Sequence, residues 1–264
     1  MKKISFIGAG RMATAMVGGI LENKLRKSAE LACCAGNDDT GRILAEKTGI
    51  RFLEQAADLP PDTDLVVLAC KPQQLDNLDP AIRQLVKGNS LLSIVAGKRI
   101  TTLQEYFPEA NTVIRCMPNT PGSIGEGFTA YTPSENLSPE DSTSIEGILG
   151  SLGEVLHVPE EWIDLVTAIS GSGPAYFFEF TAALAEAGEK IGLPAEMADK
   201  LARRTFIGAA KLLEQSGASP VDLRIAVTSP GGTTQAALEK FTERKLREIV
   251  AEASKAARDR SLEL

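Results

Sequence analysis

Histidine is almost absent from this 264-residue chain, and its only histidine, His157, falls in a stretch that reads as a β-strand. A dehydrogenase built around a histidine base is therefore not expected. The four cysteines, Cys33, Cys34, Cys70 and Cys116, contain no C-x-x-C pair and lie in apolar runs, so we expect buried reduced thiols and no metal site. This cysteine usage predicts a cytoplasmic protein.

Long apolar runs and an excess of positive charge are also lacking. No apolar run reaches the ~18 residues of a membrane span, and the opening segment is interrupted by Gly8 too early for a signal peptide. The formal net charge of −7 argues against nucleic acid or an anionic membrane as a partner. The expected partner is therefore a small molecule.

Short apolar runs alternate with helical patterns in the first half of the chain. The run 64–72 is nearly all apolar, as in a strand buried on both faces of a sheet. Such alternation predicts right-handed βαβ units and a parallel sheet, an α/β fold of the Rossmann type. Ser138 followed by Pro139 marks a helix start. The expected strands are 4–10, 31–36, 64–72, 91–97, 112–118, 127–133 and 153–159, with helices over 12–21 and 40–49.

The apolar period becomes helical throughout after about residue 160. We therefore expect a Rossmann-type domain over residues 1–160 and an all-α domain over residues 161–264. The stretch 162–193 is apolar on almost every side, and a domain of about 100 residues has difficulty burying such a helix alone. A second copy of the chain is the expected cover. Packing against the first domain within one monomer is the alternative.

A glycine-rich turn follows the first expected strand and opens the next helix. Residues 8–13 (GAGRMA) match G-x-G-x-x-G/A in the strand-to-helix context that makes this pattern specific for a dinucleotide. Gly8 permits a tight turn, Gly10 lets the backbone approach a pyrophosphate, and Ala13 lets the helix pack close to the strand. The helix N-terminus then offers free N–H groups to the phosphates. The cofactor-binding candidates here are Gly8, Ala9, Gly10, Arg11, Met12 and Ala13.

Other strand ends are expected at the same edge of the sheet, where ligands bind in such folds. The second strand ends near Asn37, a neutral side chain that can bond a ribose hydroxyl or a 2′-phosphate, so NADPH is slightly favoured and NADH stays possible. Asn119 can offer its amide to the nicotinamide carboxamide, and Lys71 reads equally well as a base or as a solvent-facing side chain. The further cofactor-binding candidates are Ala69, Lys71, Pro72, Ala96, Gly97 and Asn119.

A second glycine-rich stretch, SPGGTT at residues 229–234, directly precedes a helical pattern late in the chain. Glycines at a helix N-terminus leave N–H groups uncovered, and such a nest binds a compact anion. The neighbouring hydroxyls add donors. Because the hexapeptide contains no Lys or Arg, a carboxylate suits it better than a polyphosphate. An ordinary capped loop, with Thr233 or Thr234 as the cap, is the alternative.

Five motifs, in order, carry a resemblance to a known family. They are IGAGRM (7–12), CKPQ (70–73), RCMPNTP (115–121), SGSGPAY (170–176) and SPGGTT (229–234). Together they resemble the pyrroline-5-carboxylate reductases over essentially the whole chain. The third and fifth motifs are specific to that family, whereas the first is shared by many dehydrogenases.

The resemblance implies an activity and a set of site residues. It implies reduction of the cyclic imine 1-pyrroline-5-carboxylate to L-proline, the final step of proline biosynthesis, with NADPH and often also NADH. The substrate carboxylate would lie against Ser229, Gly232, Thr233 and Thr234, and Thr234 would be the catalytic residue that bonds the ring nitrogen. Glu160 matches a position that contacts cofactor or substrate, although as a bare charge it reads as a solvated turn residue. Interlocked homodimers, in some members assembled into larger rings, are also implied.

Two other functions stay open at this point. An oxidoreductase of the β-hydroxyacid dehydrogenase type shares both expected domains, but its chemistry requires a buried lysine in the helical domain. Lys190, Lys200 and Lys211 each have polar neighbours that indicate solvent. A nucleotide-binding regulator without turnover requires only the first glycine-rich motif. An assay of turnover separates the three functions.

Overall fold

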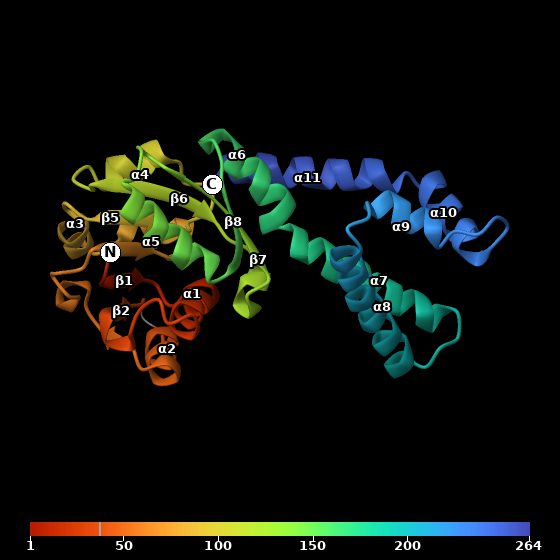
Figure 1. Cartoon of the computed structure of the whole chain (residues 1–264), viewed down its shortest axis with the longest axis horizontal. Coiled ribbons are helices and arrows are strands. Elements are labelled where there is room, and N and C mark those ends of the chain that lie inside the picture. Colours follow the sequence, from red (N-terminus) through yellow and green to blue (C-terminus); the bar gives the residue numbers. More distant parts are fainter. Residues whose placement is uncertain (37) are drawn as a thin grey trace. The chain divides into compact units, whose positions relative to one another are not determined.

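The computed structural model describes residues 1–36 and 38–264. These residues form two compact units, one of Met1–Ser172 together with Ala257–Leu264 and the other of Gly173–Ala256. The first unit contains the sheet and the second is helical (Figure 1). The expected domain division at residue 160 stays a prediction.

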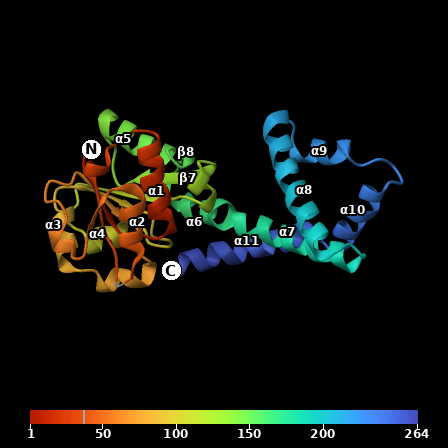
Figure 2. The same cartoon turned by 90° about the horizontal axis from the view of Figure 1, so that it is seen from below.

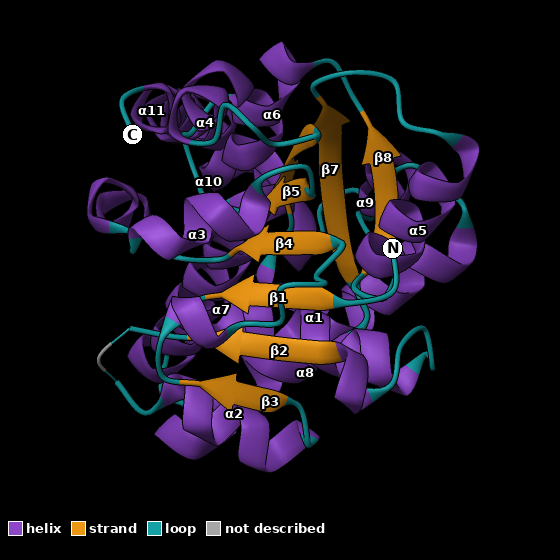
Figure 3. Cartoon of the chain, turned by 90° about the vertical axis from the view of Figure 1, so that its left-hand side faces the viewer, coloured by secondary structure: helices purple, strands orange, loops and turns teal. Residues whose placement is uncertain are grey.

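The described part of the first unit is built on an eight-stranded sheet with the strand order β3-β2-β1-β4-β5-β6-β7-β8. Figure 3 shows β3, β2, β1 and β4 side by side in this order. The first six positions follow the Rossmann order, so the predicted fold class is confirmed. The strands are β1 Ile4–Ile7, β2 Leu31–Cys34, β3 Arg51–Leu53, β4 Leu65–Leu68, β5 Ser90–Ser93, β6 Thr112–Met117, β7 Gly127–Pro133 and β8 Gly153–His157.

The sheet departs from a wholly parallel one at a single strand pair. β7 runs antiparallel to β6, with Arg115 opposite Thr132, whereas the other pairs are parallel. The connection between β6 and β7 contains only the short 3₁₀ helix η4 (Thr120–Ile124). A parallel return needs a crossover of a dozen or more residues, so this short connection forces the antiparallel pairing.

Helices cover both faces of the sheet and bury two apolar clusters against it. On one face, Met16 of α1, Leu44 of α2 and Ile145 of α5 pack with strand residues. On the other face, Ile82 of α3 and Leu103 of α4 do the same. The elements of these faces are α1 Arg11–Glu22, α2 Thr40–Thr48, α3 Pro80–Val86, α4 Ile100–Tyr106 and α5 Pro139–Gly150, with the 3₁₀ helices η1 Ser28–Glu30, η2 Ala56–Asp58 and η3 Pro72–Asn77.

Local sequence signals explain where two of these helices begin and end. The Ser138 side chain accepts a hydrogen bond from the Asp141 N–H, which confirms the predicted start of α5. α2 ends at Gly49, whose φ of +72° is the left-handed conformation that glycine adopts without a steric penalty. The start of α5 and the end of α2 are therefore determined by residues next to them in the sequence.

The second unit contains only helices among its described elements, as the sequence predicts. α7 and α8 are joined by a short loop and lie side by side (Figures 1 and 2). The rings of Phe177 in α7 and Phe206 in α8 stack with centroids 5.7 Å apart. The remaining elements after β8 are α6 Glu160–Val166 and the π-helical η5 Thr167–Gly171 in the first unit, then α7 Gly173–Lys190, α8 Ala195–Ser216, α9 Pro220–Ala226, α10 Thr233–Glu243 and α11 Leu246–Leu262, whose last turns belong to the first unit.

Among the helices of the described residues, none combines the length and the apolar content that crossing a bilayer requires. All four cysteines are free thiols, and Cys33 and Cys116 are buried. His157 lies in β8 with its ring 5.2 Å from that of Tyr131.

Candidate active site

The glycine turn after β1 has the geometry that a pyrophosphate requires. Gly8 has a φ of +106°, and a Cβ there would lie 2.6 Å from the Ala69 carbonyl oxygen, so only glycine fits. Gly10 is the N-cap of α1, and no atom lies within 4 Å of the place its Cβ would occupy. No side chain caps this helix, whereas Ala13 is buried against the sheet. The turn therefore presents open backbone at a helix N-terminus, where an anion is stabilised.

A cavity of about 380 Å³ lies beside this turn at the ends of β1, β2 and β4. Its wall includes Gly8 and the thiols of Cys34 and Cys70. Burial raises the pKa of Cys70 to about 11, and burial first, then the carboxylates of Asp79 and Asp58, raise the pKa of Cys34. Both thiols are therefore neutral at physiological pH, whereas the carboxylates of Glu54 and Asp79 also line this cavity.

A second hollow at the end of β2 carries charges of both signs. Arg42 lies there with Asp38 and Glu54, and its Nη2 atom is 3.7 Å from Glu54 Oε1. Hydrogen bonds from the Thr40 hydroxyl and N–H, and then the charge of Lys71, hold the pKa of Asp38 below its usual range. The hollow thus offers carboxylate acceptors for ribose hydroxyls as well as a cation, Arg42, for a phosphate.

The turn between β5 and α4 is packed tightly on its outer side. Gly97 has a φ of +73°, and a Cβ there would collide with Leu264 and lie 2.8 Å from the Ser261 carbonyl oxygen. Glu160 Oε1 accepts a hydrogen bond from the Ile100 N–H over 2.6 Å. The carboxylate predicted to contact a ligand is thus engaged with the first residue of α4.

The Asn119 amide is likewise engaged within the first unit. Its Nδ2 donates to Ser170 Oγ over 3.1 Å and to the Ser170 carbonyl over 3.2 Å. Its Oδ1 accepts from the Phe128 N–H over 2.9 Å. Asn119 therefore ties the π-helical η5 to the start of β7, and its contact with a nicotinamide stays a prediction.

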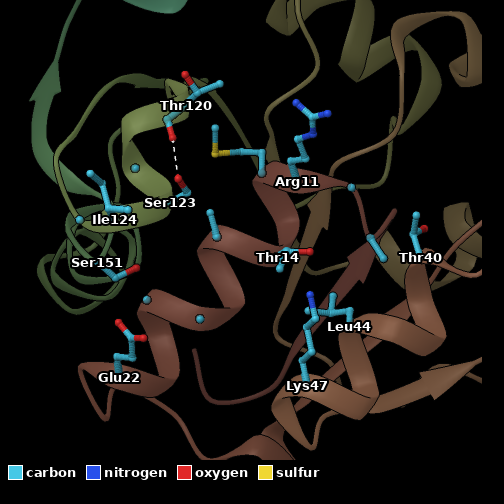
Figure 4. Close-up of a pocket in the computed structure, with 18 of the residues that line it drawn as sticks. Arg11, Thr14, Glu22, Thr40, Leu44, Lys47, Thr120, Ser123, Ile124 and Ser151 are labelled. Carbon is cyan, nitrogen blue, oxygen red and sulfur yellow. Dashed lines mark hydrogen bonds between the residues drawn. The ribbon is translucent and has the colours of Figure 1, made fainter. Parts of the chain in front are cut away.

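A larger groove of about 670 Å³ runs along α1, α2 and η4. Figure 4 shows Arg11 and Thr14 from α1, Lys47 from α2, and Thr120 and Ser123 from η4 around it. Met12 also lines this groove. Arg11 and Met12 thus line a different hollow from the one beside Gly8.

The second glycine-rich stretch is the start of α10 in the helical unit. Gly231 has a φ of +72°, and Gly232 is the N-cap of α10 with no side-chain cap. A Cβ on Gly232 would lie 2.5 Å from Ser229 Oγ, and the positive φ of Gly231 favours glycine at that position. The Gly232 N–H donates to the Ser229 carbonyl over 3.0 Å.

The amides of this turn divide into engaged and open groups. The Gly231 N–H donates to Gln235 Oε1 over 2.8 Å, and Gln235 Nε2 donates in turn to Glu239 Oε1 over 2.8 Å. The N–H groups of Thr233 and Thr234 belong to the first turn of α10, which has no side-chain cap and no acceptor for them among the described residues. The open donors of this turn are therefore these two amides with the hydroxyls beside them.

Two family models and several full-length relatives match this chain. Residues 160–264 match pyrroline-5-carboxylate reductase dimerisation, and residues 3–97 match NADP oxidoreductase, coenzyme F420-dependent. Pyrroline-5-carboxylate reductase of Pseudomonas aeruginosa is 37% identical over 264 residues, covering 99% of this chain and 96% of the relative. Pyrroline-5-carboxylate reductase 2 of Bacillus subtilis is 36% identical over 265 residues, covering 100% and 95%. The chain belongs to the pyrroline-5-carboxylate reductase family.

Solved structures of the pyrroline-5-carboxylate reductase family have the same fold. The structure from Coxiella burnetii superposes with a TM-score of 0.88 at 32% identity, covering 99% of this chain and 98% of that chain. The Plasmodium falciparum structure, which has NADP bound, superposes with a TM-score of 0.86 at 29% identity, covering 99% and 97%.

The site residues predicted from the sequence fall into two groups in the structure. Residues 8–13 adjoin Ala69, and the Ala96–Gly97 turn lies farther along the same sheet edge. Lys71 is exposed and starts η3 together with Pro72. Asn37 lies outside the described residues. The substrate candidates Ser229, Gly232, Thr233 and Thr234 all form the α10 turn in the second unit.

Several residues that shape these sites carry little local sequence signal. Gln235 restrains the α10 turn by accepting the N–H of Gly231, four residues before it. A glutamine at that spacing is common on helices and does not by itself predict this contact. Arg115 is only 1% exposed and pairs with Asp164 over 2.8 Å, a contact between β6 and α6. A buried arginine inside an apolar strand is the one signal that points to such a partner. Among the described residues, no group of three or more His, Cys, Asp or Glu side chains is arranged to hold a metal ion.

Proposed function

We propose that this chain reduces 1-pyrroline-5-carboxylate to L-proline with NADPH, and also accepts NADH, as a cytoplasmic homodimer. Family membership over the whole chain supports the reaction class. The open Gly10 cradle, the uncapped α1 and the cavity beside them fit a dinucleotide. When bound, the reduced nicotinamide supplies the hydride.

The observation that carries this proposal is the uncapped α10 turn. The N–H groups of Thr233 and Thr234 point to a compact anion, and a ring carboxylate of the imine satisfies both. The Thr234 hydroxyl then orients the ring nitrogen, where a proton makes the C=N bond a better hydride acceptor. No general base is required, in agreement with the scarcity of histidine. Positioning of the acceptor contributes several kcal/mol in reactions of this kind.

Turnover with defined substrates tests the proposal. NADPH oxidation with 1-pyrroline-5-carboxylate should be fast and yield L-proline, whereas 3-hydroxy acids with NAD⁺ should not react. Lys190, Lys200 and Lys211 are all exposed on the single chain, so none of them is the lysine buried within the helical unit that β-hydroxyacid dehydrogenase chemistry requires. Nucleotide binding without turnover of either substrate would replace the proposal with a regulatory function.

The nucleotide preference is a separate part of the proposal. A solved relative with NADP and the NADP oxidoreductase match support NADPH. The carboxylates of Asp38 and Glu54 beside Arg42 offer ribose acceptors, so NADH should be used as well. Measurement of kcat/KM with each nucleotide decides the ratio, and a higher value for NADH would overturn the preference.

The homodimer is supported by the apolar surface of the helical unit and by the dimerisation family model. Static light scattering at micromolar concentration should give a mass of at least twice 28.1 kDa. A stable monomer would contradict it. The four free thiols agree with a reducing cytoplasm.

A further inference from the structure

One polar residue is fully buried near the end of α11. Ser261 is the buried residue of α11 and is 2% exposed. Its Oγ donates to Asp164 Oδ1 over 2.7 Å, and the same carboxylate oxygen lies 2.8 Å from Arg115 Nη2. All three side chains lie in the first unit, although Ser261 is 97 residues away from Asp164 in the sequence.

The polar contacts of Ser261, Asp164 and Arg115 continue to Glu160 and to the start of α4. Arg115 Nη1 lies 3.5 Å from Glu160 Oε1, and this oxygen also accepts the Ile100 N–H over 2.6 Å. Ile100 is the first residue of α4, which directly follows the turn at Gly97. A continuous set of polar contacts therefore joins Ser261 to the N-terminus of α4.

The last turn of α11 also contacts the other side of the same loop. Gly97 packs so closely on Leu264 and on the Ser261 carbonyl that no side chain would fit. Lys98 Nζ donates to the Leu264 carbonyl oxygen. The loop between β5 and α4 is thus contacted at Gly97 and Lys98 by Ser261 and Leu264, and the residue that follows it, Ile100, is bound by Glu160.

We propose that Ser261 is a positioning residue that fixes the Ala96–Gly97 turn for the nicotinamide end of the cofactor. The proposal rests on the proposed function, since a cofactor of that function is expected at the sheet edge where Ala96 and Gly97 are cofactor-binding candidates. Without the Ser261 hydroxyl, the buried Asp164 carboxylate loses one of its two hydrogen-bond donors. We expect the carboxylate to move toward Arg115, its remaining partner. Arg115, Glu160 and the start of α4 then lose their fixed geometry.

The variant Ser261→Ala tests this in three measurements on the full chain. Amide exchange of a peptide covering residues 96–103 should become about fivefold faster in protein without nucleotide, because opening of this loop becomes easier. The emission of bound NADPH should change while its Kd stays within about twofold, since the phosphate and adenosine contacts persist. The kcat should fall about fivefold, as expected for a small misplacement of a reacting group.

The matched control is Arg260→Gln on the same turn, which breaks only the exposed pair with Glu263. It should leave all three measurements unchanged. Unchanged exchange in Ser261→Ala, or faster exchange with unchanged emission and unchanged kcat, would overturn the positioning role. A wild-type protein without reductase activity would count against the proposed function alone. Amide exchange and NADPH emission are measured without turnover, so they would still decide the role of Ser261. Lys98→Met is a second variant, expected to show the same changes in exchange and emission.

Discussion

Thr234, the residue proposed to bond the ring nitrogen of the substrate, carries a neutral hydroxyl rather than an ionisable acid. It lies in the first turn of α10, half-buried, next to two open backbone amides. The only histidine of the chain is exposed in β8 against Tyr131 and is in a different unit. The chemistry proposed for this chain therefore depends on hydrogen bonding and orientation rather than on a titrating side chain.

Replacement of Thr234 separates its hydroxyl from the backbone amides. Thr234→Ala should lower kcat at least about tenfold, which corresponds to about 1.4 kcal/mol in the barrier, while the affinity for NADPH stays unchanged. Thr234→Ser keeps the hydroxyl and should retain most of the turnover. Steady-state kinetics with 1-pyrroline-5-carboxylate measure both variants. Equal kcat in the alanine variant and the wild type would remove Thr234 from the mechanism.

Cys70 predicts a pH dependence of stability. Burial raises the pKa of its thiol from 9.0 to about 11. The folded chain therefore keeps a proton that the unfolded chain loses, and the free energy of unfolding falls as the pH rises from 9 to 11. One proton corresponds to about 1.4 kcal/mol per pH unit, and partial solvent contact makes the real fall smaller. Urea unfolding in reducing buffer should show a shallower fall in Cys70→Ala, whereas equal slopes would refute the assignment.

Two helix starts of the same design serve two proposed ligands. α1 and α10 both begin after a glycine N-cap without a side-chain cap, and a glycine with positive φ stands shortly before each. The α1 start lies beside the ends of β1, β2 and β4, and the α10 start offers the hydroxyls and amides of Thr233 and Thr234. The same backbone device is therefore proposed for a pyrophosphate in one unit and for a carboxylate in the other.

Gly10→Ala tests the first of these helix starts without disturbing the fold. A Cβ at Gly10 meets no protein atom within 4 Å, so the melting temperature should hold. The methyl group would occupy the approach of the pyrophosphate, and NADPH affinity should fall at least about tenfold. Gly18→Ala in the same helix is the control, because it too meets no atom within 4 Å and should leave affinity unchanged. Equal NADPH affinities in the two variants would show that the phosphates bind elsewhere.

Sequence patterns predict those elements whose causes are local. Strands such as β4, both glycine turns and the start of α5 follow from apolar runs, glycine and capping residues. β3 was beyond prediction because it has only three residues and an exposed first residue. The antiparallel β7 depends on the length of one connection. The Ser261–Asp164 contact spans 97 residues, and no local pattern specifies such a pairing.

At the scale of the whole molecule, the helical unit exposes large apolar side chains that a soluble monomer rarely leaves in contact with water. Phe178 of α7 is 62% exposed, and its neighbours Phe177 and Phe180 are exposed too. Phe178→Glu should dissociate the proposed homodimer or weaken it by several kcal/mol, as for a central aromatic contact in an interface. Ile43→Glu, on the exposed face of α2, is the control and should leave the mass unchanged. Light scattering over a concentration series measures both, and an unchanged mass for Phe178→Glu would contradict the proposed interface.

The most direct measurement is a crystal structure of the protein with NADP⁺ and L-proline. The account predicts that the proline carboxylate accepts hydrogen bonds from the Thr233 and Thr234 amides, with the ring nitrogen next to the Thr234 hydroxyl. A proline bound elsewhere, with those amides occupied by water or by neighbouring protein, would contradict it even if the nucleotide lies at Gly10 as expected.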